Sequence, residues 1–217
     1  RFDIQGIAFE SELIIAKAGG RGVTLSGFDK SLKWATTLNK DIAAINLSSN
    51  QWYDRSSIKG MSLLSDGTYK HRASRRWKEG RYYLNSNPAS IANSLNKMES
   101  VLVVSAGNQG LKYVNSPATW ATAEDSNGNL LMGGKMLIAG GWDSARKDVH
   151  RASNKAGHIC IKVTAVGCDD KYRTSQFYIM APMWTYGANK RSNGDGYKTV
   201  GGTSYAAPQI SGAVAIV

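Results

Sequence analysis

The chain has 217 residues, of which 42% are hydrophobic and 20% are charged, so its composition is that of a folded globular protein rather than a disordered one. Lysine and arginine number 27 against 16 aspartates and glutamates, and the resulting net charge of +11 favours acidic surfaces, anionic polymers or acidic peptides as partners. No apolar run is long enough to cross a bilayer, and the N-terminal stretch lacks the layout of a signal peptide.

The two cysteines, Cys160 and Cys168, are too few for a disulfide-rich framework or a cysteine-rich zinc site. They are compatible with one disulfide or with two free thiols. The length suits a single domain.

Apolar runs alternate with helix-like stretches along the chain. Runs typical of buried strands lie at 12–18, 42–47, 101–104 and 136–141. Helical spacing of apolar residues predicts one helix over 28–40, capped by Ser26, and another over 89–100, directly after Pro88. Apolar strands that alternate with helices indicate an α/β fold: three layers, with a mostly parallel sheet and helices on both faces. In such sheets, functional residues gather at the carboxyl ends of the strands.

Two stretches place polar side chains where chemistry is expected. In "GGTSYAAPQISG" at 201–212, Ser204 lies where a helix should begin, because the glycines permit a sharp turn and Pro208 is tolerated near a helix start. Free backbone N–H groups and the positive end of the helix dipole can stabilise an oxyanion there. Asn108 in "VVSAGNQG" follows a strand and can aim an amide N–H into the same cleft. Taken singly, each residue is equally explained as a helix cap or a turn residue.

Taken together, the stretches resemble the motifs of the subtilisin-like serine proteases, the subtilases of peptidase family S8. "GTSYAAP" and "VLVVSAGNQG" resemble the serine and oxyanion-asparagine motifs, and "AAINLSSN" resembles the strand and substrate-binding segment. "GIAFESELIIAKA" and "IMAP" resemble two further segments, and all five occur in the family's order. "SNKAG" at 153–157 is similar to secreted bacterial members, including those of autotransporters. The resemblance runs across most of residues 1–217 and implies one catalytic domain.

The resemblance implies a serine endopeptidase that acts on peptides or proteins through an acyl-enzyme. Ser204 would be the nucleophile, and the Asn108 side chain would form the oxyanion hole with the Ser204 backbone N–H. The substrate-binding residues implied in the same way are Ser48, Ser49 and Asn50 on one side of the cleft, Ser105, Ala106 and Gly107 on the other, and Thr203 beside the nucleophile. Ser49-Asn50 replaces a leucine-glycine pair of many relatives, which leaves the side-chain preference open.

A serine nucleophile needs a base, and the base needs a group that orients it. In the family the order is aspartate, histidine, serine, and the position of "GIAFES" places both partners before residue 1. His71, His150 and His158 are in no stretch that resembles the family's histidine helix. We therefore expect a domain incomplete at both ends, whose partner is a pro-segment or the remaining N-terminal part. The alternative is a catalytically inactive member that uses the fold as a binding module.

Residues 51–88 are expected to be a basic insertion, and the 69–83 patch interleaves arginines and lysines with aromatic residues. Such patches can bind nucleic acid. No nucleic-acid fold motif accompanies this one, so a solvated loop or a border of the substrate cleft is expected instead. No cofactor is implied except calcium, which relatives often bind in loops and for which "DSNGN" at 125–129 is a candidate. The family also implies a secreted, periplasmic or cell-surface location.

Overall fold

The structure is a computed structural model, and it describes residues 7–8, 10–18, 25–49, 61–63, 69–71, 77–78, 81–82, 86–111, 114, 117–122, 127, 129–156, 163–164, 167–168, 173–191 and 194–217. None of the described helices is both long and apolar enough to span a membrane.

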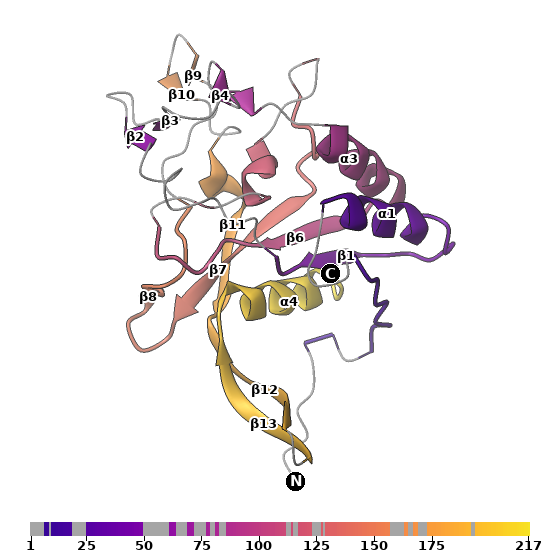
Figure 1. Ribbon diagram of the computed structural model, residues 1–217, viewed down its shortest axis with the longest axis vertical. Helices are drawn as coiled ribbons and strands as arrows, with labels where there is room; N and C mark the ends of the chain where they lie inside the picture. The colour runs from indigo at the N-terminus through magenta and orange to yellow at the C-terminus, as the bar shows by residue number, and fades with distance from the viewer. Residues whose placement is uncertain are drawn as a thin grey trace.

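A parallel sheet lies at the centre of the domain (Figure 1). Its strands in spatial order are β1 (Ala44–Leu47), β6 (Val101–Ser105), β7 (Met136–Asp143) and β11 (Tyr178–Pro182), with the short β8 (Asp148–Val149) antiparallel to β7. Leu47 pairs with Val104, and Val104 pairs with Ile138. The carboxyl ends of β1 and β6 therefore meet at one edge of the sheet, as the sequence predicts.

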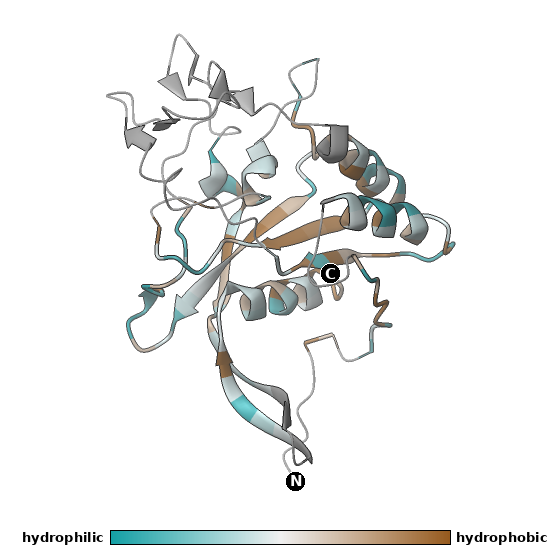
Figure 2. Cartoon of the chain, viewed as in Figure 1, coloured by the Kyte–Doolittle hydropathy of each residue, from teal (hydrophilic) through white to brown (hydrophobic). Residues whose placement is uncertain are grey.

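Helices cover both faces of this sheet, which confirms the three-layer prediction. α1 (Leu25–Ala35) and α3 (Ser86–Met98) pack together on one face, and α4 (Thr203–Val214) packs on the other (Figure 1). The side chains of β6 pack alternately on the two helical layers. Leu102 and Val104 belong to the cluster with α1 and α3, whereas Val103 belongs to the cluster with α4. β1 and β6 are accordingly coloured as strongly hydrophobic in Figure 2.

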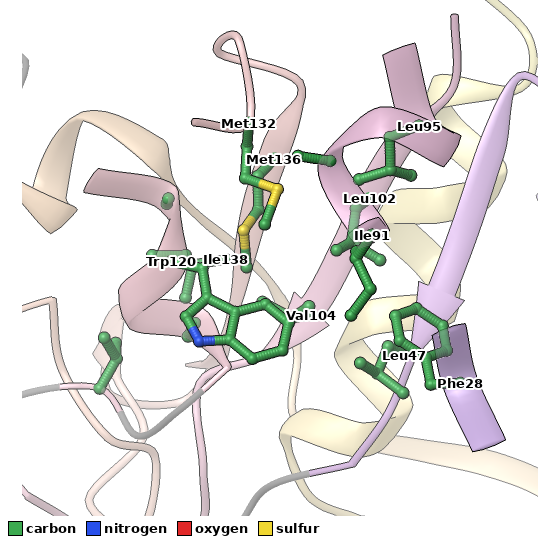
Figure 3. Packing of buried hydrophobic residues seen from close by; sticks show 14 of the residues in the cluster. Phe28, Leu47, Ile91, Leu95, Leu102, Val104, Trp120, Met132, Met136 and Ile138 are labelled. Atoms are coloured by element: carbon green, nitrogen blue, oxygen red, sulfur yellow. The ribbon is translucent and has the colours of Figure 1, made fainter. Parts of the chain in front are cut away.

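The larger cluster is built from long aliphatic side chains of the helices and strands (Figure 3). Ile91 and Leu95 of α3 are completely buried, and Phe28 of α1 lies beside Leu47 of β1. The 3-10 helix η1 (Ala118–Thr122) contributes Trp120, so the cluster also extends beyond the two helices. A second 3-10 helix, η3 (Thr174–Phe177), precedes β11.

The remaining strands form two-stranded antiparallel pairs outside the central sheet. They are β2 (Met61–Leu63) with β3 (Tyr69–His71), β4 (Trp77–Lys78) with β5 (Arg81–Tyr82), β9 (Val163–Thr164) with β10 (Gly167–Cys168), and β12 (Trp184–Arg191) with β13 (Gly194–Gly201). The β12–β13 hairpin projects away from the sheet, and its second strand leads directly into α4 (Figure 1).

The strands expected at 42–47, 101–104 and 136–141 are confirmed as β1, β6 and β7, but the strand expected at 12–18 is wrong. This stretch has no secondary structure, and Leu13 and Ile15 are each 82% exposed. An apolar run becomes a strand only where a neighbour pairs with its backbone groups. Among the described residues no strand pairs with 12–18.

The helix expected over 28–40 begins earlier and ends earlier, as α1. Ser26 lies inside the helix rather than at its cap. The early end has a local cause, since the hydroxyls of Thr36 and Thr37 donate to the carbonyls of Lys33 and Trp34, both at 2.7 Å. These side chains compete with helical hydrogen bonds and favour a turn.

The helix expected directly after Pro88 begins earlier, because α3 begins at Ser86 and Pro88 falls within its first turn. The insertion expected at 51–88 stays a prediction. Several other expectations concern residues outside the described set. These residues are Asn50, Cys160, His158, most of the 69–83 patch, and the 125–129 loop apart from Asn127 and Asn129.

Candidate active site

Ser204 is the second residue of α4, at the helix end nearest the hairpin. Gly202 joins β13 to the helix with φ 137° and ψ 158°, a conformation that residues with a side chain avoid. A Cβ at this position would also lie 3.1 Å from the Asn108 Nδ2 atom. Glycine is therefore required here both for the turn and for the space that it leaves beside Asn108. The helix start expected near Thr203 or Ser204 is confirmed.

Asn108 follows β6 and is held by the residue before Ser204. The backbone N–H and the hydroxyl of Thr203 both donate to Asn108 Oδ1, at 2.8 and 2.9 Å. Because a backbone N–H can only donate, the amide oxygen must face Thr203 and the NH2 group must face away from it. In the described part of the chain nothing accepts a hydrogen bond from Nδ2, and Asn108 is exposed. The Asn108 NH2 group is therefore an exposed donor that bonds to none of the described residues.

Thr203 is fully buried and joins the two loops of the site. Its hydroxyl donates to Asn108 and accepts a hydrogen bond from the Gly107 backbone N–H at 3.1 Å. Thr203 thus fixes the distance between the turn that carries Ser204 and the loop that carries Asn108.

Ser48, at the end of β1, reaches Ser204 from the other side. Its hydroxyl donates to the Ser204 carbonyl at 2.9 Å, and the Ser204 hydroxyl lies 3.4 Å from the Ser48 carbonyl. Pro208 explains why the Ser204 carbonyl is available: it stands four residues later in the helix and has no N–H to donate. Asn46 donates in turn to the Ser48 hydroxyl at 2.9 Å.

The model of the subtilase family matches residues 2–217. The chain belongs to the subtilase family. A comparison with curated proteins finds no match.

Among solved structures, this subtilase is similar to the self-cleaved protease domain of PatA, with 19% identity and a TM-score of 0.54 over 90% of this chain and 52% of that one. It is also similar to the prenylagaramide maturation protease PagA, with 18% identity and a TM-score of 0.52 over 89% and 49%. A third similar structure is the PatG macrocyclase in complex with peptide, with 14% identity and a TM-score of 0.50 over 87% of this chain and 40% of that one. At these identities the likeness shows the fold, and the chain spans about half the length of the first structures it matches.

The subtilase fold brings together Ser48, Asn108 and Ser204, from the ends of two strands and the start of a helix. Ser49 is half-buried beside Ser48. On the opposite side, Ser105 and Ala106 are completely buried, backbone and side chain alike. Contact of these residues with substrate stays a prediction.

No described histidine side chain forms a hydrogen bond with Ser204 in this subtilase. The only partner of the Ser204 hydroxyl within the described residues is the Ser48 carbonyl. His150 is engaged elsewhere, with its Nε2 atom 3.2 Å from the Trp184 indole nitrogen. In the same part of the chain, no group of three or more histidine, cysteine, aspartate or glutamate side chains could hold a metal ion.

Sequence reasoning missed two contributors to the site of this subtilase. One is the link from Pro208 through the Ser204 carbonyl to Ser48. The other is Asn154, whose buried side chain holds the loop of Asn108 and whose only sequence signal was the "SNKAG" stretch.

Proposed function

We propose that this subtilase domain is a serine endopeptidase in which Ser204 attacks the scissile carbonyl and Asn108 stabilises the oxyanion. Membership of a family of serine proteases supports the class of reaction. The observation that carries the residue roles is the Asn108 amide, whose oxygen is turned toward Thr203 and whose NH2 group is left without an acceptor among the described residues.

A second donor supports the same assignment. The backbone N–H of Ser204 lies in the first turn of α4, where helical N–H groups have no partner within the helix. It has no other acceptor among the described residues. Two donors fixed before the substrate arrives can stabilise the negative charge that develops on the carbonyl oxygen, with little reorganisation.

The mechanism also needs a base that takes the proton of Ser204 and a carboxylate that orients this base. We assign both to residues upstream of Arg1, in line with the family's order of aspartate, histidine and serine. β1 supports this assignment, since β6 pairs with one of its edges and no described strand pairs with the other. A further parallel strand on that edge would bring its carboxyl end beside Ser48 and Ser204.

The substrate is proposed to be a peptide that runs along the carboxyl ends of β1 and β6. Ser48, Ser49 and Asn50 would pair with its backbone as an added strand, and Ser105, Ala106 and Gly107 would form the facing wall. In a strand addition of this kind, backbone hydrogen bonds supply affinity and the neighbouring pockets supply selectivity.

Labelling with a fluorophosphonate tests the proposal. The native protein is labelled and digested, and mass spectrometry locates the adduct and identifies every peptide present. We expect the adduct on Ser204 and its loss in Ser204→Ala. Ser211→Ala is the matched control, because Ser211 lies on the same helix and its hydroxyl bonds, among the described residues, to the Ala207 carbonyl alone. Asn108→Ala should lower kcat by about 100- to 1000-fold with little change in KM, the range that removal of such a donor causes in subtilisin, the namesake of the family.

An unlabelled Ser204 in a sample that contains an upstream histidine peptide would contradict the proposal. That result would favour the alternative, a binding module that keeps the fold and acts through its basic 69–83 patch.

A further inference from the structure

Asn154 lies behind the loop that carries Asn108 and is completely buried. Its Oδ1 atom accepts hydrogen bonds from the backbone N–H groups of Gln109 and Leu111, both at 3.0 Å. Its Nδ2 atom donates to the Ala106 carbonyl at 3.1 Å and to Gln109 Oε1 at 3.0 Å. An asparagine amide has two acceptor sites and two N–H donors, so the side chain is fully used, and all of its contacts are with residues on either side of Asn108.

The backbone around Asn154 binds the same loop. Its own N–H donates to the Gly107 carbonyl at 2.8 Å, and the Gly110 N–H donates to the Ala152 carbonyl at 2.8 Å. The Lys155 N–H donates to the Leu111 carbonyl at 2.9 Å. Residues 106–111 are therefore held along their whole length by residues 152–155, while none of these hydrogen bonds involves the Asn108 side chain.

Gly107 allows the loop to lie directly on the Asn154 amide. Its φ is 111°, and a Cβ at this position would be 2.3 Å from Asn154 Nδ2. The close approach makes the position of the loop depend on the asparagine side chain, because both hydrogen-bonding atoms of the amide are fixed on backbone groups.

We propose that Asn154 is a positioning residue for the oxyanion hole, and this inference rests on the proposed function. Thr203 holds the Asn108 amide, and Asn154 holds the backbone on either side of Asn108. The two together set the distance between Asn108 Nδ2 and the Ser204 N–H. A displacement of about 1 Å in such a site can lower a rate by about 100-fold.

Two substitutions separate this role from general stability. Asn154→Ala removes all four side-chain hydrogen bonds. Asn154→Asp keeps the shape and both accepted bonds but places a carboxylate against the Ala106 carbonyl, and it serves if the alanine variant does not fold. Ser153→Ala is the matched control. Ser153 is equally buried, and its hydroxyl accepts from the Gly141 N–H of β7 and donates to the Asn154 carbonyl. The control therefore removes a hydrogen bond to the backbone of Asn154 but none to the 106–111 loop.

The measurements use the complete enzyme with a peptide substrate. We expect Asn154→Ala and Asn154→Asp to lower kcat by about 10- to 100-fold with a much smaller change in KM, whereas Ser153→Ala changes kcat by less than about threefold. When Asn108 is already alanine, Asn154→Ala should cost less than about threefold, because its effect passes through Asn108. An equal loss in both backgrounds, or an equal loss in Ser153→Ala, would overturn the inference.

Failure of the proposed function gives a different pattern. In that case wild type is not labelled at Ser204 and turns over no peptide. The side-chain NH2 signals of Asn108 in an NMR spectrum then test the positioning directly. These signals should shift in Asn154→Ala and stay in place in Ser153→Ala, and unchanged signals in both variants would refute the positioning role.

Discussion

The Ser204 carbonyl lies in a helix but cannot make the usual helical hydrogen bond. The residue four positions later is Pro208, which lacks an N–H and whose ring crowds the carbonyl of the residue four positions before it. The Ser48 hydroxyl takes the place of the missing donor at 2.9 Å. A proline in the helix thus makes the turn that carries Ser204 depend on the end of β1.

This dependence predicts a non-additive pair of substitutions. Ser48→Ala leaves the half-buried Ser204 carbonyl without a partner and should lower the free energy of unfolding by about 1–3 kcal/mol. With Pro208→Ala in place, the new N–H can bond to the carbonyl, and Ser48→Ala should then cost less than about 1 kcal/mol. Urea unfolding of the four proteins measures the coupling, with Ser49→Ala as the control. The same cost for Ser48→Ala in both backgrounds would contradict this account.

Where β11 pairs with β7, Tyr178 packs over Gly140. A Cβ on Gly140 of β7 would lie 2.1 Å from the Tyr178 hydroxyl, so the ring occupies the space that glycine leaves. The hydroxyl donates to the Asn154 carbonyl at 2.6 Å and lies 3.3 Å from Ser153 Oγ. Burial raises the pKa of Tyr178, and the hydrogen bond with Ser153 opposes this only in part.

The raised pKa predicts a specific loss of stability in alkali. The folded state holds the phenol proton more tightly than the unfolded state, in which the pKa is about 10. The contribution of Tyr178 to stability is therefore complete below about pH 10 and is lost as the pH rises through the folded value. In Tyr178→Phe this group is absent. The difference in free energy of unfolding between wild type and Tyr178→Phe should be constant from about pH 7 to 9 and should fall above about pH 10. A difference that does not change with pH would show that the phenol is not held in this way.

The elements that could be predicted are those whose signal is local. β1, β6 and β7 are apolar runs between helices, and the two motif residues Ser204 and Asn108 stand directly at element ends. The stretch 12–18 has the same composition as those strands, but composition does not say whether a pairing partner is present. The β12–β13 hairpin alternates glycine, polar and aromatic residues and gave no apolar run to find.

The contacts that complete the site could not be predicted because they join distant parts of the chain. Asn154 is 45 residues from Gln109, and Ser48 is 156 residues from Ser204. The residues that flank Asn154 and Ser48 in the sequence do not indicate these contacts, which depend on where the sheet places the two side chains.

At the scale of the whole molecule, the net positive charge is a property that plays no part in the contacts described at the site. The formal net charge is +11, and the ion pairs found among the described residues are Lys33 with Asp29 and Lys40 with Glu12. A net charge of this size surrounds the protein with a positive field. A field of this sign raises the local concentration of anionic substrates and accelerates their encounter with the site.

If the domain is a peptidase, this field predicts that cleavage of acidic peptides depends on salt. The Debye length falls from about 10 Å at 0.1 M salt to about 3 Å at 1 M, so attraction between surface charges is largely lost. For a peptide with several acidic residues beyond the cleaved bond, kcat/KM should fall several-fold over this range of salt while kcat stays constant. For a neutral peptide of the same length, kcat/KM should change little.

Substitution of Arg75 and Arg76 by glutamine tests whether the 69–83 patch is the source of the attraction. A loss of the salt effect would place the acidic part of the substrate beside the patch, whereas an unchanged effect would assign it to the charge of the whole domain. If acidic and neutral peptides respond equally to salt, the positive charge has no part in substrate selection.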